Sequence, residues 1–394
     1  MTPQAVVSRR GAERIRRGHP WIFRSDVDDV SAEPGDIVRV TGERGRPLGW
    51  ATFSDVSQIT LRMISRDEEP LPDLPAWLGA RIRAAAAFRA TLEIDSTAWR
   101  LINGESDGLP ATIVDRYGDE GGAEYFVVQT LSQASHRWLP SLIEALVEYA
   151  HPRGIVVRND PKVRQLEGLD LNVHVAYGEV PERVAVREGA VVYHADLRTG
   201  QKTGLFLDQR ENHRAAAVYA RGDALDGFTY NGGFALQMAA KATSVLALDS
   251  SASAVAATVE NVKRNRLEHV EVREANVFDE LRELEISRTR FDTITLDPPA
   301  FAKNKAAVER ALAGYKEINL RAMRLLRPGG HLVTCSCSYN VDETMFLSVL
   351  QDAAADARAE MGLVEKRAQG RDHPMLLAVP ETFYLKCIVL RRLS

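Results

Sequence analysis

Short apolar runs alternate with stretches of helical periodicity from about residue 186 onward. The apolar runs lie at 191–197, 224–226, 245–248, 270–272, 293–296 and 331–334, and the clearest helical stretches at 212–219 and 253–265. This alternation predicts a mostly parallel sheet with helices on both faces and right-handed crossovers. Such sheets bind ligands beyond the carboxyl ends of their strands, so the polar residues that follow each run are candidate site residues.

The first half of the chain has a different pattern. Short β-prone runs separated by turn residues fill residues 36–63 and predict a small β-barrel. An acidic stretch with two prolines at 67–74 is typical of a linker. Beyond it, helical stretches at 77–92 and 138–149 are mixed with strand-like runs, which predicts a small α+β domain. We therefore expect a multidomain α/β protein with domains at residues 1–70, 71–185 and 186–394.

Charge adds one feature to this picture. The formal net charge of −4 argues against a general nucleic-acid coat protein. Residues 1–24, which we expect to open with a helix, nevertheless hold six arginines and a single acid, Glu13. Such a stripe can contact phosphates, although a solvated helix face explains it equally well. We expect Trp21, Phe23 and Trp50 to lie in the barrel core rather than to stack on bases.

Composition excludes several classes of protein. The three cysteines are too few for a disulfide framework, and no His/Cys spacing resembles a zinc site. The sequence has no apolar run of about 18 residues and no signal-peptide pattern at its start. We therefore expect a cytoplasmic protein that holds no metal and does not cross a membrane.

Polar residues and glycines follow four predicted strands in succession. The first run ends in Asp226 and a glycine loop at 227–234, where the backbone can approach a ligand closely. Asp249 ends the second run and could accept both hydroxyls of a ribose, and Asn276 after the third could hydrogen-bond an adenine edge. The loop lacks the Gly-x-Gly-x-x-Gly of dinucleotide enzymes. With Asp297-Pro298-Pro299 after the next run, this order resembles that of class I S-adenosylmethionine methyltransferases.

Longer runs carry a closer resemblance. They are Gly18–Phe23, Gly104–Pro110, Lys202–Arg210, Tyr230–Phe234, Asp297–Phe301, Ser336–Ser338, Asp372–Pro374 and Tyr384–Lys386. Through them the whole chain resembles the bacterial large-subunit ribosomal RNA cytosine-C5 methyltransferases with an N-terminal PUA domain. The resemblance implies a PUA-like β-barrel, a small central α+β domain and a Rossmann-like class I methyltransferase domain.

The resemblance also implies ligands and a site. The cofactor would be S-adenosylmethionine, and the substrate 23S ribosomal RNA, either naked or in a precursor large subunit. The residues expected to hold the cofactor are Asp208, Gln209, Asp226, Phe228, Asn231, Gly232, Gly233, Phe234, Asp249, Ser250 and Asn276. The oligomeric state stays open, with a homodimer as one option.

Methylation at C5 of cytosine calls for a thiolate. C5 is a poor nucleophile, and a thiolate that adds to C6 makes it enamine-like. In the wider RNA cytosine-C5 family the nucleophile lies seven residues after the second glycine of a Gly-Gly pair, which here is Gly330 and points to Cys337. Asp297 fits a role at N3 and the exocyclic amine. We expect Cys335 and Cys387 to be buried side chains without a chemical role.

Three alternatives remain open on the sequence. The base that removes the C5 proton is not identified, because region 297–303 holds no second cysteine; His373 is a candidate, and a structural role for Asp372-His373-Pro374 is equally plausible. Asp-Pro-Pro before an aromatic residue also resembles enzymes that methylate purine nitrogens, which need no thiol. A non-catalytic RNA-binding assembly factor would use the basic stripe and the barrel as well.

Overall fold

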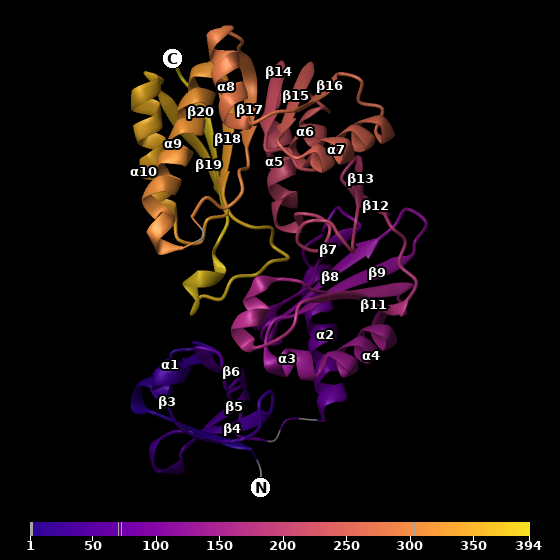
Figure 1. Ribbon diagram of the computed structural model, residues 1–394, viewed down its shortest axis with the longest axis vertical. Coiled ribbons are helices and arrows are strands. Elements are labelled where there is room, and N and C mark those ends of the chain that lie inside the picture. Colours follow the sequence, from indigo (N-terminus) through magenta and orange to yellow (C-terminus); the bar gives the residue numbers. More distant parts are fainter. Residues whose placement is uncertain (1–2, 70, 72, 303) are drawn as a thin grey trace. The chain divides into compact units, whose positions relative to one another are not determined.

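The structure, a computed structural model, describes residues 3–69, 71, 73–302 and 304–394 (Figure 1). The described residues divide into two compact units. The first unit runs up to Arg187 and includes the segments Ala195–Leu207 and Arg371–Thr382. The second comprises Glu188–His194, Asp208–Gly370 and Phe383–Ser394. The chain passes between the units several times, and the three consecutive domains expected from the sequence stay a prediction.

The first unit begins with the N-terminal sheet, which in the described residues has six strands in the order β2-β6-β5-β4-β1-β3. The strands are β1 (Gln4–Val7), β2 (Trp21–Phe23), β3 (Val27–Ser31), β4 (Ile37–Thr41), β5 (Pro47–Phe53) and β6 (Ile59–Ser65). Neighbours are antiparallel except for β1 and β4, which run parallel. The core of this sheet is mostly aliphatic and includes Val38, Val40, Leu61 and one aromatic side chain, Phe53. The strands predicted within residues 36–63 are confirmed.

The basic segment at the N-terminus is not one helix. Residues before Ser8 alternate, with Ala5 and Val7 buried and Gln4 exposed, and this period of two forms β1 instead. The helix α1 is short (Arg9–Arg16), and the Ser8 side chain caps it by accepting a hydrogen bond from the Gly11 backbone N–H. The expected opening helix therefore begins only at Arg9.

Trp21, Phe23 and Trp50 are half-buried and lie outside the buried core of the N-terminal sheet, so the prediction that they form this core is wrong. The indole N–H of Trp21 donates to a Glu105 carboxylate oxygen at 2.8 Å, and that of Trp50 to the Glu69 carbonyl at 2.9 Å. Indoles are often placed with one wet edge because the ring is apolar and the N–H is polar. Mostly aliphatic side chains fill the interior in place of these three.

The central sheet of the first unit has, among the described residues, five strands in the order β11-β10-β9-β8-β7. They are β7 (Ala98–Asn103), β8 (Thr112–Gly118), β9 (Glu124–Thr130), β10 (Gly154–Asn159) and β11 (Asn172–Gly178), and the helices are α2 (Leu74–Ala90), α3 (Gln133–Arg137) and α4 (Leu139–Ala150). Helices α2 and α4 pack on each other and enclose a core with Trp77, Phe126 and Leu142. The predicted α+β pattern is confirmed, although β7 was not expected.

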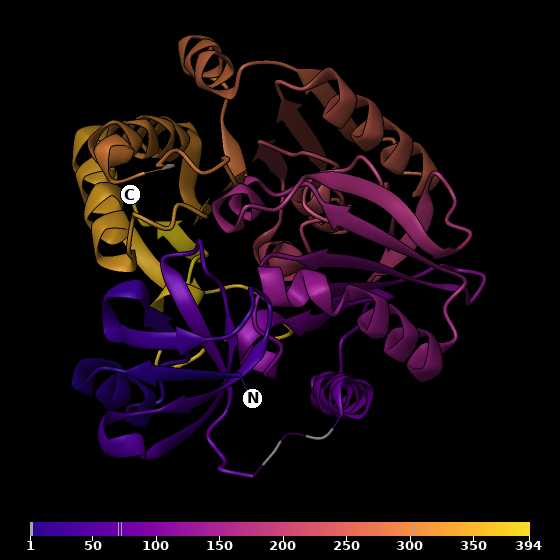
Figure 2. The same ribbon diagram turned by 60° about the horizontal axis from the view of Figure 1, so that its bottom comes forward.

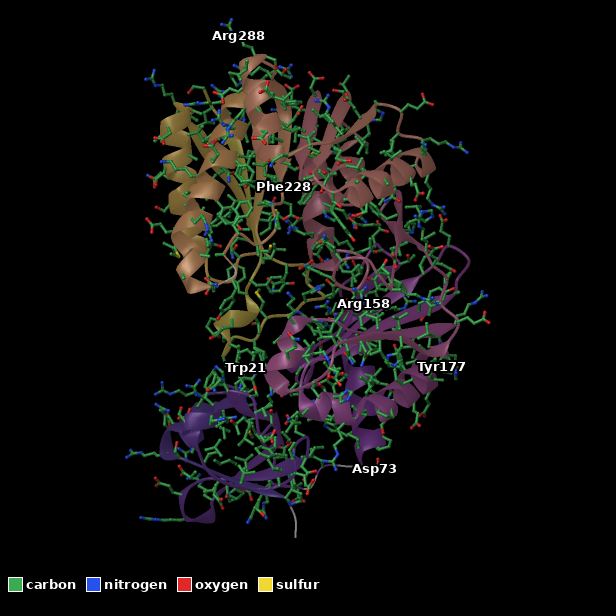
Figure 3. All side chains as sticks on the ribbon, in the orientation of Figure 1. Trp21, Asp73, Arg158, Tyr177, Phe228 and Arg288 are labelled. Atoms are coloured by element: carbon green, nitrogen blue, oxygen red, sulfur yellow. The ribbon has the colours of Figure 1, made fainter. Side chains whose placement is uncertain are left out.

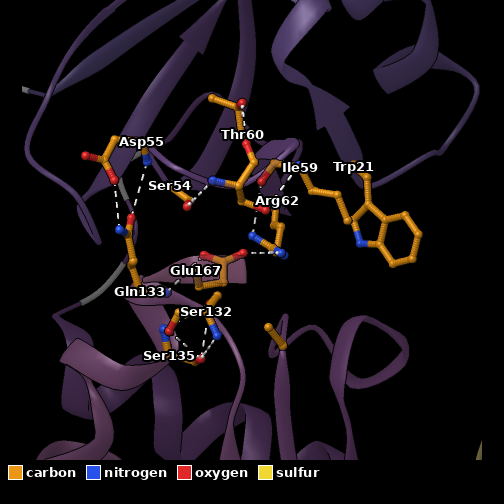
Figure 4. A network of polar contacts seen from close by, with 12 residues as sticks. Trp21, Ser54, Asp55, Ile59, Thr60, Arg62, Ser132, Gln133, Ser135 and Glu167 are labelled. Carbon is orange, nitrogen blue, oxygen red and sulfur yellow. Dashed lines mark hydrogen bonds and ion pairs between the residues drawn. The ribbon is translucent and has the colours of Figure 1, made fainter. Parts of the chain in front are cut away.

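Polar contacts, some of them buried, join the N-terminal sheet to the central one (Figure 4). Arg62 of β6 is buried, and its Nη2 lies 2.8 Å from Oε1 of Glu167. Glu167 is equally buried, and its other oxygen accepts from the Gln133 backbone N–H at 3.3 Å. The Gln133 amide donates in turn to Asp55 at 2.8 Å. The linker at 67–74 is therefore not the sole attachment between the two sheets in the described residues.

Two later segments of the chain pack on the central sheet. Arg158 of β10, labelled in Figure 3, donates to the Gly200 carbonyl at 2.9 Å. The Thr203 hydroxyl donates to a carboxylate oxygen of Asp115 in β8 at 2.6 Å. In the second segment, an oxygen of Asp372 accepts from the Arg100 backbone N–H at 2.8 Å. These bonds explain why both segments belong to the first unit.

The second unit contains a sheet with seven strands in its described part, in the order β16-β15-β14-β17-β18-β20-β19. Its strands are β14 (Asp223–Gly227), β15 (Ser244–Asp249), β16 (Val270–Glu274), β17 (Phe291–Leu296), β18 (Leu326–Ser336), β19 (Met361–Arg367) and β20 (Lys386–Arg392), and β12 (Val184–Glu188) and β13 (Val191–Ala195) precede them. The first five in sheet order are parallel, which confirms the predicted pattern. β20 runs antiparallel to β18 and β19.

Helices flank this sheet in two groups. They are α5 (Arg210–Tyr219), α6 (Gly233–Met238) and α7 (Ala252–Arg264), and then α8 (Val277–Ile286), α9 (Val308–Leu325) and α10 (Glu343–Ala357). Helices α9 and α10 lie side by side in both views (Figures 1 and 2) and share a core with β17 and β18 that includes Tyr315 and Phe346. Among the helices described, none is long and apolar enough to span a bilayer.

Candidate active site

The sequence-predicted site residues lie where parallel strands of the second unit end. β14 leads into the loop 228–232, β15 ends at Asp249, and Asn276 follows β16 and caps α8. β17 ends one residue before Asp297, and β18 ends one residue before Cys337. These five strands are adjacent and parallel, so their carboxyl ends meet along one edge of the sheet.

The two glycines after β14 have no room for a side chain. Gly232 has φ of +91°, and a Cβ on it would lie 2.2 Å from a methyl carbon of Leu236. A Cβ on Gly233 would lie 2.5 Å from the imidazole ring of His213. The loop backbone therefore packs directly onto neighbouring side chains, and its close approach to a ligand stays a prediction.

Helix α7 holds this loop from outside. The Thr258 hydroxyl donates to the Tyr230 carbonyl at 2.7 Å, and the Asn261 amide donates to the Asn231 carbonyl at 2.9 Å. Tyr230 itself has φ of +51°, a conformation that side chains adopt at a cost. The loop shape is thus fixed by partners in the described structure, and a ligand finds it preformed.

Asp226 organises the loop from inside. Its carboxylate is fully buried and accepts hydrogen bonds from the Thr229 hydroxyl (2.6 Å), the Thr295 hydroxyl (2.5 Å) and the Ala235 backbone N–H (3.0 Å). Burial raises the pKa of Asp226 to about 6, even though these hydrogen bonds act in the opposite direction. These three hydrogen bonds fix the shape of the loop, and direct contact of Asp226 with the cofactor stays a prediction.

Asp249 has the geometry to hold a diol. One carboxylate oxygen accepts from the Tyr230 backbone N–H and the other from the Ser251 backbone N–H, both at 2.9 Å. Each oxygen keeps a lone pair beyond the one used, so two ligand hydroxyls can still be bound. Asp249 is half-buried and Ser250 beside it is exposed. The described residues at this strand end fit the ribose of S-adenosylmethionine.

Aromatic side chains extend from the loop toward the Asp-Pro-Pro turn. Phe228, labelled in Figure 3, lies edge-on to Phe278 with ring centroids 6.3 Å apart. Phe278 contacts Phe301 at 5.9 Å, and Phe301 contacts Tyr315 at 4.7 Å. Asn276 is exposed near the start of this row, and its oxygen accepts from the Phe278 backbone N–H at 3.0 Å. Phe278 and Phe301 were not predicted as site residues, although Phe301 belongs to the Asp297–Phe301 run.

A buried histidine near the glycine loop was also not expected. His213 in α5 lies edge-on to Phe234, with ring centroids 4.6 Å apart, and its Nδ1 is 3.1 Å from a Glu188 carboxylate oxygen. Burial lowers the pKa of His213, but the charge and hydrogen bond of Glu188, with smaller contributions from Asp297 and Asp226, outweigh it and the pKa is raised. Phe234 is therefore a packing residue under the loop, in contact with this pair.

Asp208 and Gln209 are buried as well. An oxygen of Asp208 accepts from the Tyr384 hydroxyl at 2.7 Å, and its backbone carbonyl accepts from the Gly370 N–H at 2.8 Å. Gln209 accepts from the Asn212 amide at 2.7 Å. Both residues lie in the second unit, where these contacts hold them in the interior. Their direct contact with the cofactor stays a prediction.

The cysteines of β18 occupy different environments. Cys335 is fully buried and stands directly opposite Cys387 in the ladder of β18 and β20. Burial raises the pKa of the Cys335 thiol well above its usual range, and the neighbouring Cys387 and the charge of Asp297 act in the same direction. Cys337 lies beyond the strand end and is partly exposed. Its Sγ is 3.8 Å from the Pro298 carbonyl, so the structure brings this thiol and the Asp-Pro-Pro turn together.

Hydroxyl groups hold the turn on both sides of Cys337. The Ser336 hydroxyl lies 3.0 Å from the Tyr315 hydroxyl, which is 2.9 Å from that of Ser338. The hydroxyl oxygen of Ser338 also accepts a hydrogen bond from the Ala302 backbone N–H at 3.1 Å. The residues flanking the thiol are thereby fixed to α9 and to the segment after the Asp-Pro-Pro turn.

The Asp372–Pro374 run is bound within the first unit. The Arg89 guanidinium donates to the Asp372 carbonyl at 2.8 Å, and the Ser106 hydroxyl to the Pro374 carbonyl at 2.8 Å. His373 is buried, with Nδ1 3.1 Å from an Asp372 oxygen. These contacts favour the structural alternative for His373. In the part of the chain that the structure describes, no three His, Cys, Asp or Glu side chains are grouped to hold a metal ion.

Comparison with known proteins agrees with this geometry. Residues 6–66 match the model of a PUA-like domain, and residues 164–390 that of an S-adenosylmethionine-dependent methyltransferase. Ribosomal RNA large subunit methyltransferase I of Shewanella frigidimarina is 39% identical over 392 residues, which cover 97% of each chain. The protein of the same name from Aliivibrio fischeri is 38% identical over 399 residues, covering 99% of this chain and 100% of its own.

Solved structures show the same fold. A methyltransferase from Streptococcus mutans aligns with a TM-score of 0.81 at 18% identity, covering 99% of this chain and 100% of its own. A methyltransferase in complex with S-adenosylhomocysteine aligns with a TM-score of 0.82 at 19% identity and the same coverage. The chain therefore belongs to the family of the ribosomal RNA large subunit methyltransferase I proteins, and it is an S-adenosylmethionine-dependent methyltransferase with an N-terminal PUA-like domain.

Proposed function

We propose that this protein methylates C5 of a cytosine in 23S ribosomal RNA through a covalent bond between Cys337 and C6. The substrate class comes from the relatives, which are named ribosomal RNA large subunit methyltransferases. The observation that carries the C5 chemistry is a partly exposed thiol beside the Asp-Pro-Pro turn. The cytoplasmic location that such a substrate requires stays a prediction.

In this reaction Cys337 and Asp297 each have a defined task. The Cys337 thiolate forms a bond to C6, and the electron pair displaced from the C5–C6 double bond makes C5 nucleophilic. S-Adenosylmethionine supplies the methyl group, which C5 takes as S-adenosylhomocysteine departs. Loss of the C5 proton then restores the double bond and expels the thiolate. Asp297 would hydrogen-bond N3 and the exocyclic amine, where charge changes as the thiolate adds.

The basic residues of α1 support contact with RNA in part. Arg9 and Arg16 of this helix and Arg17 directly after it are exposed and could face phosphates, although Arg16 and Arg17 both pair with Glu13. Arg10 forms an ion pair with Asp26, whose second oxygen lies 3.7 Å from Arg14. Exposure and pairing overlap in this stripe, since Arg10 is exposed even though it pairs with Asp26.

A trapped adduct tests the proposal directly. RNA with 5-fluorocytosine at the target has no C5 proton to lose, so the bond between sulfur and C6 should persist after methyl transfer. Denaturing electrophoresis should show this adduct with the wild type and with Cys335→Ala, and not with Cys337→Ala. Cys337→Ala should lose methylation by at least about 10³-fold, the usual scale for a nucleophile, and still bind cofactor.

Three results would contradict this proposal. An adduct that survives in Cys337→Ala and disappears in Cys335→Ala would move the nucleophile to Cys335. Methylated purine nitrogen in the product, with no adduct for any variant, would favour the purine alternative. Methylation absent from every RNA, with RNA binding intact, would favour an assembly factor.

A further inference from the structure

A lysine is buried directly behind the turn that carries Cys337. Lys386 begins β20 and stands opposite Ser336 in the ladder with β18. Its side chain is only 2% exposed. Its Nζ donates to the Ser338 carbonyl at 2.8 Å and to the Tyr384 carbonyl at 2.9 Å. The ammonium is therefore held against the residue that follows the thiol.

This lysine has no acidic partner to offset its burial. No carboxylate among the described residues lies within ion-pair distance of Nζ, and two neutral carbonyls accept two of its three N–H groups. A buried charge is costly unless it is paired or neutralised. Burial lowers the pKa of Lys386 to about 8, while the charges of Cys337 and Asp342 act against this change. The group is therefore poised to accept an anion nearby.

The thiolate required at Cys337 is that anion. Other ionisable groups approach the turn from neighbouring elements, namely Asp297 after β17, Tyr315 of α9, Asp342 before α10, Cys335 of β18, and Tyr384 and Cys387 near β20. Ionised carboxylates in this set would disfavour a thiolate, whereas an ammonium favours it. We propose that Lys386 is the buried counter-charge that stabilises the thiolate form of Cys337. The inference rests on the proposed function only in making Cys337 the nucleophile.

Alkylation of the thiol tests this ion pair without RNA or methyl transfer. The full-length protein is treated with iodoacetamide across a series of pH values, and modification of the Cys337 peptide is followed by mass spectrometry. Lys386→Met should raise the apparent pKa of the Cys337 thiol by about one unit, which slows alkylation about tenfold at pH values below that pKa. Lys386→Arg keeps the charge and should stay close to the wild type.

A matched lysine serves as control. Lys366 lies in the adjacent strand β19, is exposed, and pairs with Glu343, so Lys366→Met should leave the pH profile unchanged. An unchanged profile in Lys386→Met, with the protein folded, would overturn the inference. A profile shifted equally in Lys366→Met would do so as well, because it would reveal a general effect of surface charge.

A reciprocal measurement covers the case in which Lys386→Met does not fold. Cys337→Ala removes a partly exposed side chain, and the Lys386 side chain can be titrated by NMR through a ¹³C label at Cε. The pKa of Lys386 should be lower in Cys337→Ala than in the wild type, because the attracting thiolate is gone. An identical pKa in both proteins would refute the pairing.

The outcomes for reaction and ion pair are separable. A cytosine adduct together with an unshifted alkylation profile would retain the C5 reaction and remove the role of Lys386. A shifted profile without any adduct would retain the ion pair and remove the C5 reaction.

Discussion

Two loops at one edge of the same sheet each enclose a buried ionisable side chain, and the two charges are opposite. Asp226 lies under the glycine loop after β14, and Lys386 lies under the turn after β18. Burial favours the neutral form of each group. It raises the pKa of Asp226 to about 6 and lowers the pKa of Lys386 to about 8. Similar physics therefore acts on both sites.

The hydrogen-bond partners distinguish the two groups. Asp226 accepts from two hydroxyls and from the Ala235 backbone N–H, which fixes how α6 begins. Lys386 donates to two carbonyls, and the thiol of Cys337 lies one residue from the first of them. The acid thus shapes a binding loop through neutral donors, whereas the base is placed to act on a neighbouring charge. These two side chains show that a buried ionisable group points to function mainly when its hydrogen-bond partners leave part of its charge unbalanced.

The largest expected effect that tests this comparison is the contribution of Asp226 to the free energy of unfolding. The pKa of Asp226 is raised on folding, so between about pH 4 and 6 the folded state binds more protons than the unfolded state. Its contribution to the free energy of unfolding is then fully present at low pH and falls as pH rises through the folded pKa. Ionisation should cost on the order of 3 kcal/mol by pH 7, since one pKa unit is about 1.4 kcal/mol.

Asp226→Asn removes this titration. Urea unfolding, followed by a probe in the second unit, should show the wild type losing stability relative to Asp226→Asn as pH rises from 4 to 7. The hydrogen bonds that the amide cannot accept change the variant by an amount that does not depend on pH. A difference between the two proteins that is constant over this range would contradict the buried, titrating acid.

A smaller effect should distinguish the cofactor-binding side of the sheet edge, which holds Asp249, from the turn that carries Cys337. The quantity compared is the affinity for the cofactor. Asp249→Ala should weaken S-adenosylhomocysteine binding about 30-fold, roughly the 2 kcal/mol of one charge-assisted hydrogen bond, as measured by calorimetric titration. Asp223→Ala is the matched control, because Asp223 begins β14 at the opposite edge of the sheet. Cys337→Ala should bind the cofactor like the wild type. Unchanged affinity in Asp249→Ala would remove this residue from the site.

The smallest effect concerns the hydroxyl cluster at the turn. Tyr315→Phe deletes the hydroxyl that bridges Ser336 and Ser338 and should cost about 1 kcal/mol of stability. Methylation should slow about fivefold with cofactor affinity unchanged, because only the placement of the thiol is loosened. Tyr219→Phe, which removes a bond to Glu365 elsewhere, is the control. Equal methylation rates in the two variants would show that the cluster does not position Cys337.

Local patterns sufficed for the parallel sheet and the strand ends. The runs that lead to Asp249, Asp297 and Cys337 are short, β-prone and mostly buried, as strands of a covered parallel sheet are, and a polar residue ends or directly follows each strand's apolar part. The choice between Cys335 and Cys337 came from motif register, and the structure adds that only the second of them lies beyond the strand. Their chemical roles stay a prediction.

Other features had no local signal. β7 reads Ala-Trp-Arg-Leu-Ile-Asn, and its buried and half-buried positions do not alternate, because its register with β8 shifts between Arg100 and Ile102. The His213–Glu188 contact joins residues from separate elements. Lys386 resembles an ordinary surface lysine in sequence, and its burial arises only when β20 pairs with β18. Tertiary pairing decides all three, and a single sequence does not display it.

The Arg62–Glu167 ion pair sets an order of events during synthesis. Its partners are separated by 105 residues, and both are buried in the finished protein. At about 5–20 residues per second, the ribosome needs roughly 5–20 s to reach Glu167 after Arg62. During that interval the N-terminal sheet can form, but the guanidinium of Arg62 lacks this partner and has at most the longer contact with Glu105, at 3.9 Å, so it must stay hydrated, since burying it without its full set of partners is unfavourable. The nascent sheet therefore keeps one side open to water until the ribosome has made most of the central sheet.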